Sequence, residues 1–243
     1  MSITRDPYFK KMIPLSFRDV DMEFATSQQL FSSHDIDHGT QRLLRTLIFE
    51  EIDSYQKVLD LGCGYGPVGL SLAKQQSDAT VHLTDVDALA LRYARANAEH
   101  NEVSDRVEVF PSVGFQSVQD RDYDFILSNI PAKVGPEALR HLLFAAANHL
   151  TASGKMAIVV VDEIYAQVSE LLESNEAIEI QYHRAWPGHH VYHYRFTDRD
   201  AAAASDHYDI SAFARNRREF FYKKHEFQLD TSYALGEFDE LSY

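Results

Sequence analysis

A glycine-rich stretch at residues 57–69 constrains the fold of this chain more than any other feature, and it reads K-V-L-D-L-G-C-G-Y-G-P-V-G. Its first half is a short apolar run, which is typical of a buried parallel strand. Three glycines then alternate with other residues, and Pro67 follows where a helix can begin. Glycine lets the backbone approach a ligand closely, and a helix N-terminus offers free N–H groups and a positive dipole end. The stretch therefore predicts a ligand-binding turn between a strand and a helix. The alternative is a tight turn without a ligand.

The order D-x-G-x-G-x-G differs from the G-x-G-x-x-G of dinucleotide-binding folds. It resembles the glycine loop of class I methyltransferases, which bind S-adenosylmethionine. The resemblance implies that Asp60, at the end of the strand, holds the amino group of the cofactor, often through water. It also implies that the methionine and ribose part of the cofactor lies against the loop residues Gly62, Cys63, Gly64, Tyr65 and Gly66.

The rest of the chain alternates apolar strands with amphipathic helices, which indicates an α/β fold. We expect strands at 79–85, 106–110, 123–129 and 156–161, and helices at 68–74, 88–101, 136–150 and 163–173. Two final strands, at 178–182 and 191–196, lie too close for a crossover helix and should pair as a hairpin. The resemblance implies a seven-stranded Rossmann-like methyltransferase sheet, mostly parallel with one reversed strand, with helices on both faces.

Further cofactor contacts are expected at the ends of the next two strands. Asp85 follows Asp60 by 25 positions, which suits an acid that hydrogen-bonds ribose hydroxyls, although it could instead cap a helix. Asp87 is expected to cap the helix at 88–101. Related enzymes usually carry an acid after the third strand to accept from the adenine amino group, but this chain has Ser112 and Val113 there. Backbone groups, Ser112 or apolar packing must then hold adenine, and we assign Val86, Thr40 and Asn129 to the same cofactor site.

A second motif follows the fourth strand, where Asn129, Ile130 and Pro131 resemble the N-P-P-[FY] motif of enzymes that methylate planar nitrogens. The resemblance implies that the Asn129 side-chain oxygen and the Ile130 carbonyl accept the hydrogens of an amine. Such fixed acceptors would aim the nitrogen lone pair at the methyl sulfonium. Ala132 stands where the family usually has an aromatic residue that stacks on the base. The alternative is an ordinary strand-end turn in which Asn129 acts as a cap.

The segment before the cofactor domain carries the pattern F-S-x-x-x-I-D-x-G-T-x-x-L-L, starting at Phe31, with a helix expected to begin near Thr40. This pattern resembles the small-domain RNA methyltransferases, which include bacterial ribosomal-RNA enzymes that methylate the exocyclic amine of guanine. In them the segment helps to close over the methionine end of the cofactor. His34 and His38 could form an H-x-x-x-H metal pair, but no third ligand is near, and we expect a solvated turn and no metal. We expect strand and turn positions, rather than ligands, for His189, His190 and His193.

Charge and composition limit the possible partners. The 243 residues carry a net charge of −14, which argues against indiscriminate binding to nucleic acid but not against a local basic patch. The single cysteine cannot form an internal disulfide, and the N-terminus lacks the apolar core of a signal peptide. No run approaches the roughly 18 apolar residues of a membrane span. We therefore expect a cytoplasmic protein that does not associate with membranes, and its oligomeric state is open.

We divide the chain into an N-terminal lead-in (1–37), a methyltransferase domain (38–196) and a C-terminal extension (197–243). The extension begins with an alanine-rich linker and continues into a basic and aromatic stretch. This stretch either contacts RNA, through phosphates and bases, or forms a helix that packs on the domain. The substrate contacts that we predict are Phe31, Lys133 and Trp186 at the mouth of the site, and Arg215, Arg217, Arg218, Lys223 and Lys224 in the extension.

Taken with the resemblance, these residues predict an S-adenosylmethionine-dependent N-methyltransferase that acts on an exocyclic amine of a base in ribosomal or other RNA, with guanine favoured. One alternative is a methyltransferase of a small molecule or a protein amide, which Ala132 and the acidic surface favour. The other alternative is a non-catalytic partner protein that binds the cofactor. The presence of both Asn129 and Pro131 argues against it.

Overall fold

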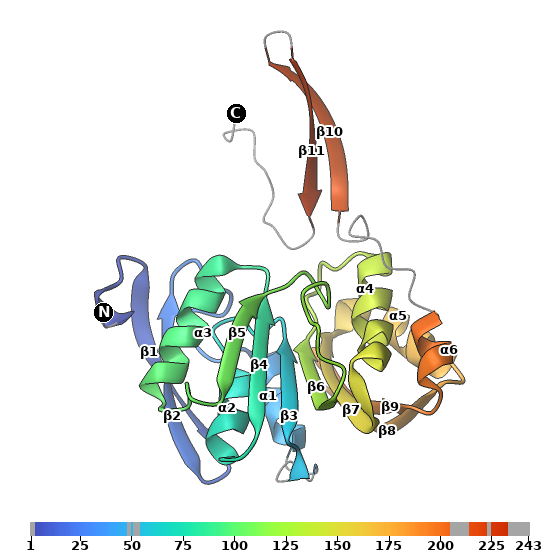
Figure 1. The fold of residues 1–243 in the computed structure, drawn as a ribbon. Coiled ribbons are helices and arrows are strands. Elements are labelled where there is room, and N and C mark those ends of the chain that lie inside the picture. Colours follow the sequence, from blue (N-terminus) through green and yellow to red (C-terminus); the bar gives the residue numbers. More distant parts are fainter. Residues whose placement is uncertain (1–2, 48–49, 51–53, 205–213, 223–224, 233–243) are drawn as a thin grey trace.

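The computed structural model describes residues 3–47, 50, 54–204, 214–222 and 225–232. Its centre is a seven-stranded sheet in the order β5-β4-β3-β6-β7-β9-β8 (Figure 1). The strands are β3 (Lys57–Leu61), β4 (Thr80–Asp85), β5 (Val107–Pro111), β6 (Tyr123–Asn129), β7 (Leu150–Val161), β8 (Ile178–Trp186) and β9 (His189–Phe196). Only β9 runs antiparallel to its neighbours in this sheet. The predicted fold class, including the single reversed strand and the final hairpin, is confirmed.

Helices cover both faces of the sheet because its strands bury apolar side chains on both sides. One core contains Val58, Phe125 and Val159 and packs against α1 (His38–Thr46), α2 (Pro67–Gln75) and α3 (Ala88–His100). The other core contains the neighbouring residues Leu59 and Ile126 and packs against α4 (Pro136–Phe144) and α5 (Asp162–Glu173). Alternate residues of one strand therefore serve opposite cores, as the period of two in a strand requires.

Two alanine-rich segments differ from their predicted structure. The helix expected over 136–150 ends at Phe144, a 3₁₀ helix η4 (Ala145–Asn148) follows, and Leu150 already opens β7. The apolar period misled the sequence interpretation because Leu150 is indeed buried, but on a strand. The linker expected after residue 197 instead begins with α6 (Arg199–Ala204), where Ala202 is fully buried and Arg199 Nη1 donates to the Leu150 carbonyl at 2.6 Å. Small side chains in η4 let α6 approach closely.

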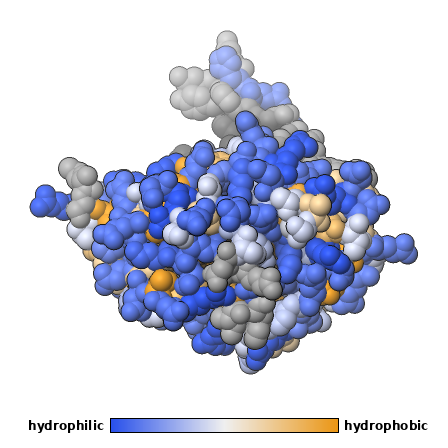
Figure 2. All heavy atoms as spheres, turned by 60° about the horizontal axis from the view of Figure 1, so that its bottom comes forward, coloured by the Kyte–Doolittle hydropathy of each residue, from blue (hydrophilic) through white to orange (hydrophobic). Residues whose placement is uncertain are grey.

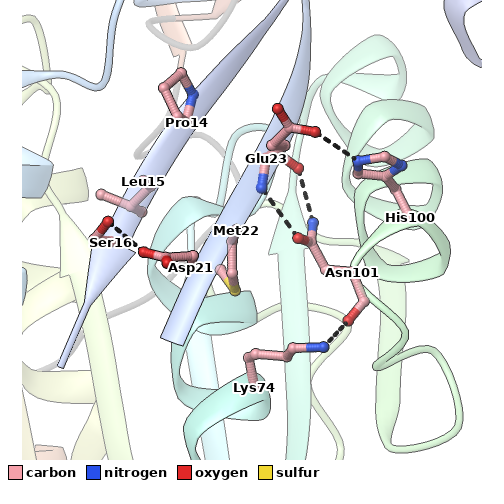
Figure 3. A pocket seen from close by; sticks show the side chains of 9 residues that line it. All are labelled: Pro14, Leu15, Ser16, Asp21, Met22, Glu23, Lys74, His100 and Asn101. Atoms are coloured by element: carbon pink, nitrogen blue, oxygen red, sulfur yellow. Dashed lines mark hydrogen bonds and ion pairs between the residues drawn. The ribbon is translucent and has the colours of Figure 1, made fainter. Parts of the chain in front are cut away.

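A hairpin of β1 (Phe9–Phe17) and β2 (Val20–Ser27) precedes the sheet, after a short 3₁₀ helix η1 (Ile3–Arg5), and packs beside α3 (Figure 1). Asn101 donates to the Glu23 carbonyl at 2.9 Å and accepts from the Glu23 N–H at 3.2 Å (Figure 3). Asn97 pairs with Ala25 in the same way, at 3.1 and 2.7 Å. Four helical residues rise about 6 Å and two strand residues about 6.6 Å, so the two asparagines match alternate residues of β2. The two asparagines thus give the β2 backbone hydrogen bonds of the kind that a neighbouring strand would give.

A cavity of about 420 Å³ lies at this junction of hairpin and helices (Figure 3). Met22 and Lys74 are among its lining residues, and the Lys74 ammonium donates to the Asn101 carbonyl at 2.8 Å. None of the residues that the sequence assigns to cofactor or substrate lines this cavity. It belongs to the attachment of the hairpin and not to the glycine loop.

The C-terminal extension contains a second hairpin, of β10 (Ala214–Tyr222) and β11 (His225–Ser232), which projects away from the sheet in Figure 1. The packing helix considered for this segment is therefore wrong. Residues 226–230 alternate polar and apolar types, and this strand pattern lies just beyond the basic and aromatic stretch. Arg215, Arg217 and Arg218 lie on β10, whereas Lys223 and Lys224 lie outside the described residues.

The face of the molecule shown in Figure 2 is mostly hydrophilic, with hydrophobic residues in small separate patches. In the described part of the chain, no helix is both long enough and apolar enough to span a membrane.

Candidate active site

The glycine loop leaves space for a ligand at two of its three glycines. Gly62, Gly64 and Gly66 have φ angles of 77°, 56° and 95°, which favour glycine. A Cβ built on Gly62 or Gly64 would meet no atom within 4 Å, whereas one on Gly66 would lie 2.7 Å from the Leu70 side chain. Gly66 thus serves the packing of α2, and the first two glycines border open space. This cradle fits a cofactor that approaches the backbone of the loop.

Asp85 fixes the shape of this loop. Its carboxylate accepts from the Gly64 N–H at 2.8 Å and from the Asp87 N–H at 2.9 Å. Asp87, and not Asp85, caps α3, by accepting from the Leu89 N–H at 2.8 Å, which confirms the predicted cap. Burial raises the pKa of Asp85. The next residue, Val86, is 38% exposed, as expected for a residue that a ligand covers.

Asp60 lies at the end of β3 with only 3% of its surface exposed. Its Oδ2 accepts from the Gly69 N–H at 2.8 Å, and a Cβ on Gly69 would lie only 3.0 Å from that oxygen, so glycine allows this close contact. Burial raises the pKa of Asp60 to about 7, and the negative charge of Asp85 adds to this. A nearby positive charge stabilises the ionised form of such a buried carboxyl group. Asp60 is therefore suited to a cationic ligand, such as the amino group of S-adenosylmethionine.

The affinity for S-adenosylhomocysteine should therefore depend on pH. Because Asp60 keeps its proton below about pH 7 and only the carboxylate attracts an ammonium group, we expect the dissociation constant to rise by up to about tenfold per pH unit below 7. Above that pH it should level off. Calorimetric titration at about 25 °C between pH 5.5 and 8.5 measures this dependence of the dissociation constant on pH. Asp60→Asn is the control, and this variant should bind more weakly and show no pH dependence. A flat profile in the unsubstituted protein would contradict this role for Asp60.

Asn129, at the end of β6, is held by the N-terminus of α1. Its Nδ2 donates to Asp37 Oδ2 at 2.7 Å and to Thr40 Oγ1 at 3.3 Å. A carboxylate only accepts hydrogen bonds, so Asp37 fixes the orientation of the amide and leaves Asn129 Oδ1 as an acceptor for another group. The same Asp37 oxygen caps α1 by accepting from the Thr40 N–H at 3.0 Å. Asn129 therefore contacts α1 instead of capping the turn after its own strand.

Sequence reasoning quoted Asp37 and Gly39 within a motif but assigned neither to the site. A Cβ on Gly39 would lie 2.9 Å from Asp37 Oδ2 and 3.2 Å from both polar atoms of the Asn129 amide. Only glycine permits so close an approach of α1 to the end of β6. The sequence did contain a signal for Asp37, which lies three residues before Thr40. This is the spacing between a helix N-cap and the N–H group that its side chain accepts from.

The residues that follow Asn129 line the outside of the same strand end. Ile130 is buried, and its N–H donates to the Val159 carbonyl at 3.0 Å. The next three residues are exposed, as expected for a turn that faces a substrate: Pro131, Ala132 and Lys133. Phe31 is also 79% exposed, the largest value among the large hydrophobic residues of the described chain. Its neighbour Ser32 accepts from the Tyr65 hydroxyl at 3.5 Å, which places Phe31 close to the glycine loop.

Other predicted cofactor residues turn out to point inward. The Cys63 side chain is buried in the core, where burial raises the pKa of its thiol, so only its backbone borders the loop surface. Tyr65 is buried against Phe24, with ring centroids 6.2 Å apart. The Ser112 hydroxyl donates to the Gly114 carbonyl at 2.7 Å and accepts from the Ser117 N–H at 3.0 Å. It already serves its own turn, so Val113 and the backbone are left as the main candidates to hold adenine.

Asn97 links the N-terminal hairpin to the glycine loop and was missed by sequence reasoning. Besides pairing with Ala25, its Nδ2 donates to the Tyr65 carbonyl at 2.9 Å. Asn101 pairs with the same hairpin but makes no such contact with the loop. The sequence gives one signal for Asn97, which is a polar residue at a helix position where the spacing predicts an apolar one.

We expect Asn97→Ala to weaken S-adenosylhomocysteine binding about tenfold, because a loosened Tyr65 carbonyl loosens the loop. Asn101→Ala is the matched control, since it loses the same kind of pairing with β2 but leaves the loop intact. Thermal unfolding should show similar losses of stability for both variants, while calorimetry should show weaker binding only for Asn97→Ala. Equal affinities in the two variants would mean that Asn97 only attaches the hairpin.

The histidines take structural places. His193 is buried, and its ring nitrogens lie 2.7 Å from Glu50 Oε1 and 2.7 Å from Thr46 Oγ1. His190 stacks on Tyr165 with ring centroids 3.6 Å apart. Among the described residues no group of three or more His, Cys, Asp or Glu is arranged to hold a metal ion.

Solved methyltransferases share this fold. The 16S rRNA N2 G1207 methyltransferase RsmC of T. thermophilus, in complex with AdoMet and guanosine, superposes with a TM-score of 0.63 over 77% of this chain and 50% of its own, at 19% identity. A ribosomal protein L11 methylase of Lactobacillus delbrueckii subsp. bulgaricus gives a TM-score of 0.58 over 70% of this chain and 88% of its own, at 20% identity. The chain thus has the fold of these solved methyltransferases.

Sequence comparison gives the family. The family model described as the methyltransferase small domain matches residues 21–184, and the chain belongs to this family. It is 35% identical to protein YbxB of Bacillus subtilis over 144 residues, which are 59% of this chain and 70% of YbxB. It is also 33% identical to ribosomal RNA small subunit methyltransferase C of Haemophilus influenzae over 166 residues, 65% of this chain. The chain spans about half the length of the latter relative, 48%.

Proposed function

We propose that this protein transfers a methyl group from S-adenosylmethionine to an exocyclic amine of a base in RNA, with guanine favoured, in the cytoplasm. The carrying observation is the Asn129 amide, whose nitrogen is held by Asp37 at 2.7 Å so that its oxygen is set as an acceptor beside the glycine cradle. Similarity to ribosomal RNA small subunit methyltransferase C supports RNA as the substrate class. We assign the methyl transfer to residues 38–196, and Phe31 and Asp37 of the preceding segment contribute to the same site.

When bound, the cofactor supplies an electrophilic methyl group on its sulfonium. Asn129 Oδ1 and the Ile130 carbonyl accept the two hydrogens of the amine and thereby direct its nitrogen lone pair. Pro131 holds the Ile130 carbonyl in place. Because an exocyclic amine has a very low pKa, it needs no general base before attack, and its proton can leave after transfer. Asp60 binds the amino end of the cofactor, and Asp85 is proposed to bind its ribose.

The alternative substrate is a protein amide or a small molecule, and Ala132 favours it. This residue is exposed, and it offers no aromatic ring to stack on a base where the resemblance leads us to expect one. Phe31 is the exposed aromatic residue nearest in the chain to the α1 N-terminus, and we propose that it supplies the missing contact.

One incubation separates these possibilities. The protein is mixed with S-adenosylmethionine labelled in its methyl group and, separately, with the RNA, protein and metabolite fractions of a bacterial lysate. Label in RNA supports the proposal, label in protein or metabolites supports the alternative, and no label in any fraction would indicate a non-catalytic protein.

A further inference from the structure

Two arginines lie over the ring of Trp186, the last residue of β8. The Arg184 Cζ lies 4.7 Å from the centroid of the indole ring, and the Arg42 Cζ, on α1, lies 5.7 Å from it. These distances are typical of cation–π contacts. Arg184 is exposed, while Arg42 and Trp186 are half-buried. We call these three residues the arginine–tryptophan patch.

The patch lies at the same edge of the sheet as the candidate active site. Val159 of β7 pairs with Asn129, Val161 of β7 with His189, and His189 with Trp186. Since β6, β7 and β8 run in the same direction, Asn129 and Trp186 both end their strands at the carboxyl edge. Three strand spacings of about 4.8 Å separate β6 from β8, and Trp186 lies two residues, about 6.6 Å, further along the strands, so the two residues are about 16 Å apart. This is the span of a few nucleotides.

The patch carries two positive charges in a protein whose net charge is negative. Among the described residues neither Arg42 nor Arg184 has a carboxylate partner, although the chain carries a net charge of −14. The Arg42 Nε is buried and has no hydrogen-bond acceptor there. By contrast, Arg195 on the neighbouring strand β9 forms a 2.6 Å ion pair with Glu179. Two guanidinium groups that lack a carboxylate partner in the described part of an acidic protein are suited to an anionic ligand.

We infer that the arginine–tryptophan patch binds an RNA strand next to the target base, with the arginines on phosphates and the indole stacked on a flanking base. This inference rests on the proposed function and adds the surface that positions the RNA. Guanidinium groups contact phosphates and aromatic rings stack on unpaired bases regardless of sequence. The patch therefore contributes affinity for RNA, while Asn129 contributes the chemistry.

The test compares Arg184→Gln with Arg195→Gln. Both residues are exposed arginines on adjacent strands, and both variants lose one positive charge, but only Arg184 lies over Trp186. Protein-free small-subunit ribosomal RNA is the probe, both for methylation kinetics and for binding measured at several salt concentrations. We expect Arg184→Gln to raise the Michaelis constant several-fold with turnover unchanged, and to flatten the log–log salt slope by about 0.7. Arg195→Gln should leave both unchanged.

Two further measurements complete the test. The double variant Arg42→Gln, Arg184→Gln should flatten the slope by about 1.4, and Arg184→Lys should restore most of it. Affinity for S-adenosylhomocysteine should be the same in all variants. If the unsubstituted protein methylates the RNA but Arg184→Gln and Arg195→Gln behave alike, the patch inference is overturned and the proposed function stands. If the unsubstituted protein neither binds nor methylates RNA, both are overturned.

Discussion

Replacing Asn129 by alanine is expected to lower turnover at least about 100-fold while the affinity for S-adenosylhomocysteine stays nearly unchanged. The reason lies in the orientation of the amide. Asp37 and Thr40 accept from the Asn129 Nδ2, so the amide oxygen faces away from them and can accept a hydrogen bond from a substrate. Alanine removes this acceptor, and an amine without it loses its alignment with the methyl group. The glycine cradle does not include the Asn129 side chain and should bind cofactor as before.

Steady-state kinetics with RNA and calorimetry with S-adenosylhomocysteine check this expectation. Ser128→Ala is a suitable control because Ser128 precedes Asn129 on β6 and donates a buried hydrogen bond to the Leu61 carbonyl at 2.8 Å. It should cost stability but leave turnover within a few-fold. If Asn129→Ala lowered cofactor affinity as much as turnover, Asn129 would be a structural residue.

Gly64→Val should abolish cofactor binding at millimolar ligand without preventing folding. The φ angle of 56° costs any other residue about 1–2 kcal/mol, and a valine side chain would enter the space that the cofactor needs. Gly188→Val is the matched control, because Gly188 has a φ of 84° and its added Cβ also meets nothing within 4 Å. Gly188 lies in the β8–β9 turn, away from the glycine loop.

Circular dichroism should show folded protein for both variants, and calorimetry should detect cofactor binding only for Gly188→Val. Normal binding by Gly64→Val would show that the open space at Gly64 is not the cofactor cradle. The pair thus separates the backbone cost of a positive φ, which both variants share, from the loss of a binding surface.

The order of strands and helices was predictable because local patterns determine it. The apolar strand that contains Val58 and Leu61 leads into a glycine loop, and a proline at the first helical position marks where α2 begins. The Ile178 and Val191 segments are too close for a crossover helix, so their pairing as a hairpin followed from the chain length between them, while the single reversed strand was implied by the family resemblance.

The contacts that fix the candidate site were less predictable, because they join residues far apart in the sequence. Asp37 meets Asn129 only after α1 has packed on the sheet, and Asn97 meets Tyr65 only through the fold. A short motif identified Asn129, but neither its partner Asp37 nor which atom of the amide is left for a ligand. The packing helix considered for the extension was wrong for a different reason, since the strand pattern of β11 lies beyond the basic and aromatic stretch.

The identity of the methylated atom tests the central claim most directly. Ribosomal RNA labelled by this protein from methyl-labelled S-adenosylmethionine is digested to nucleosides, and the labelled nucleoside is identified by chromatography and mass spectrometry. The arrangement of Asn129 Oδ1 predicts a methyl group on an exocyclic nitrogen, with N2-methylguanosine the expected product. Label on a ring carbon or on a ribose oxygen, neither of which offers two hydrogens to fixed acceptors, would contradict it.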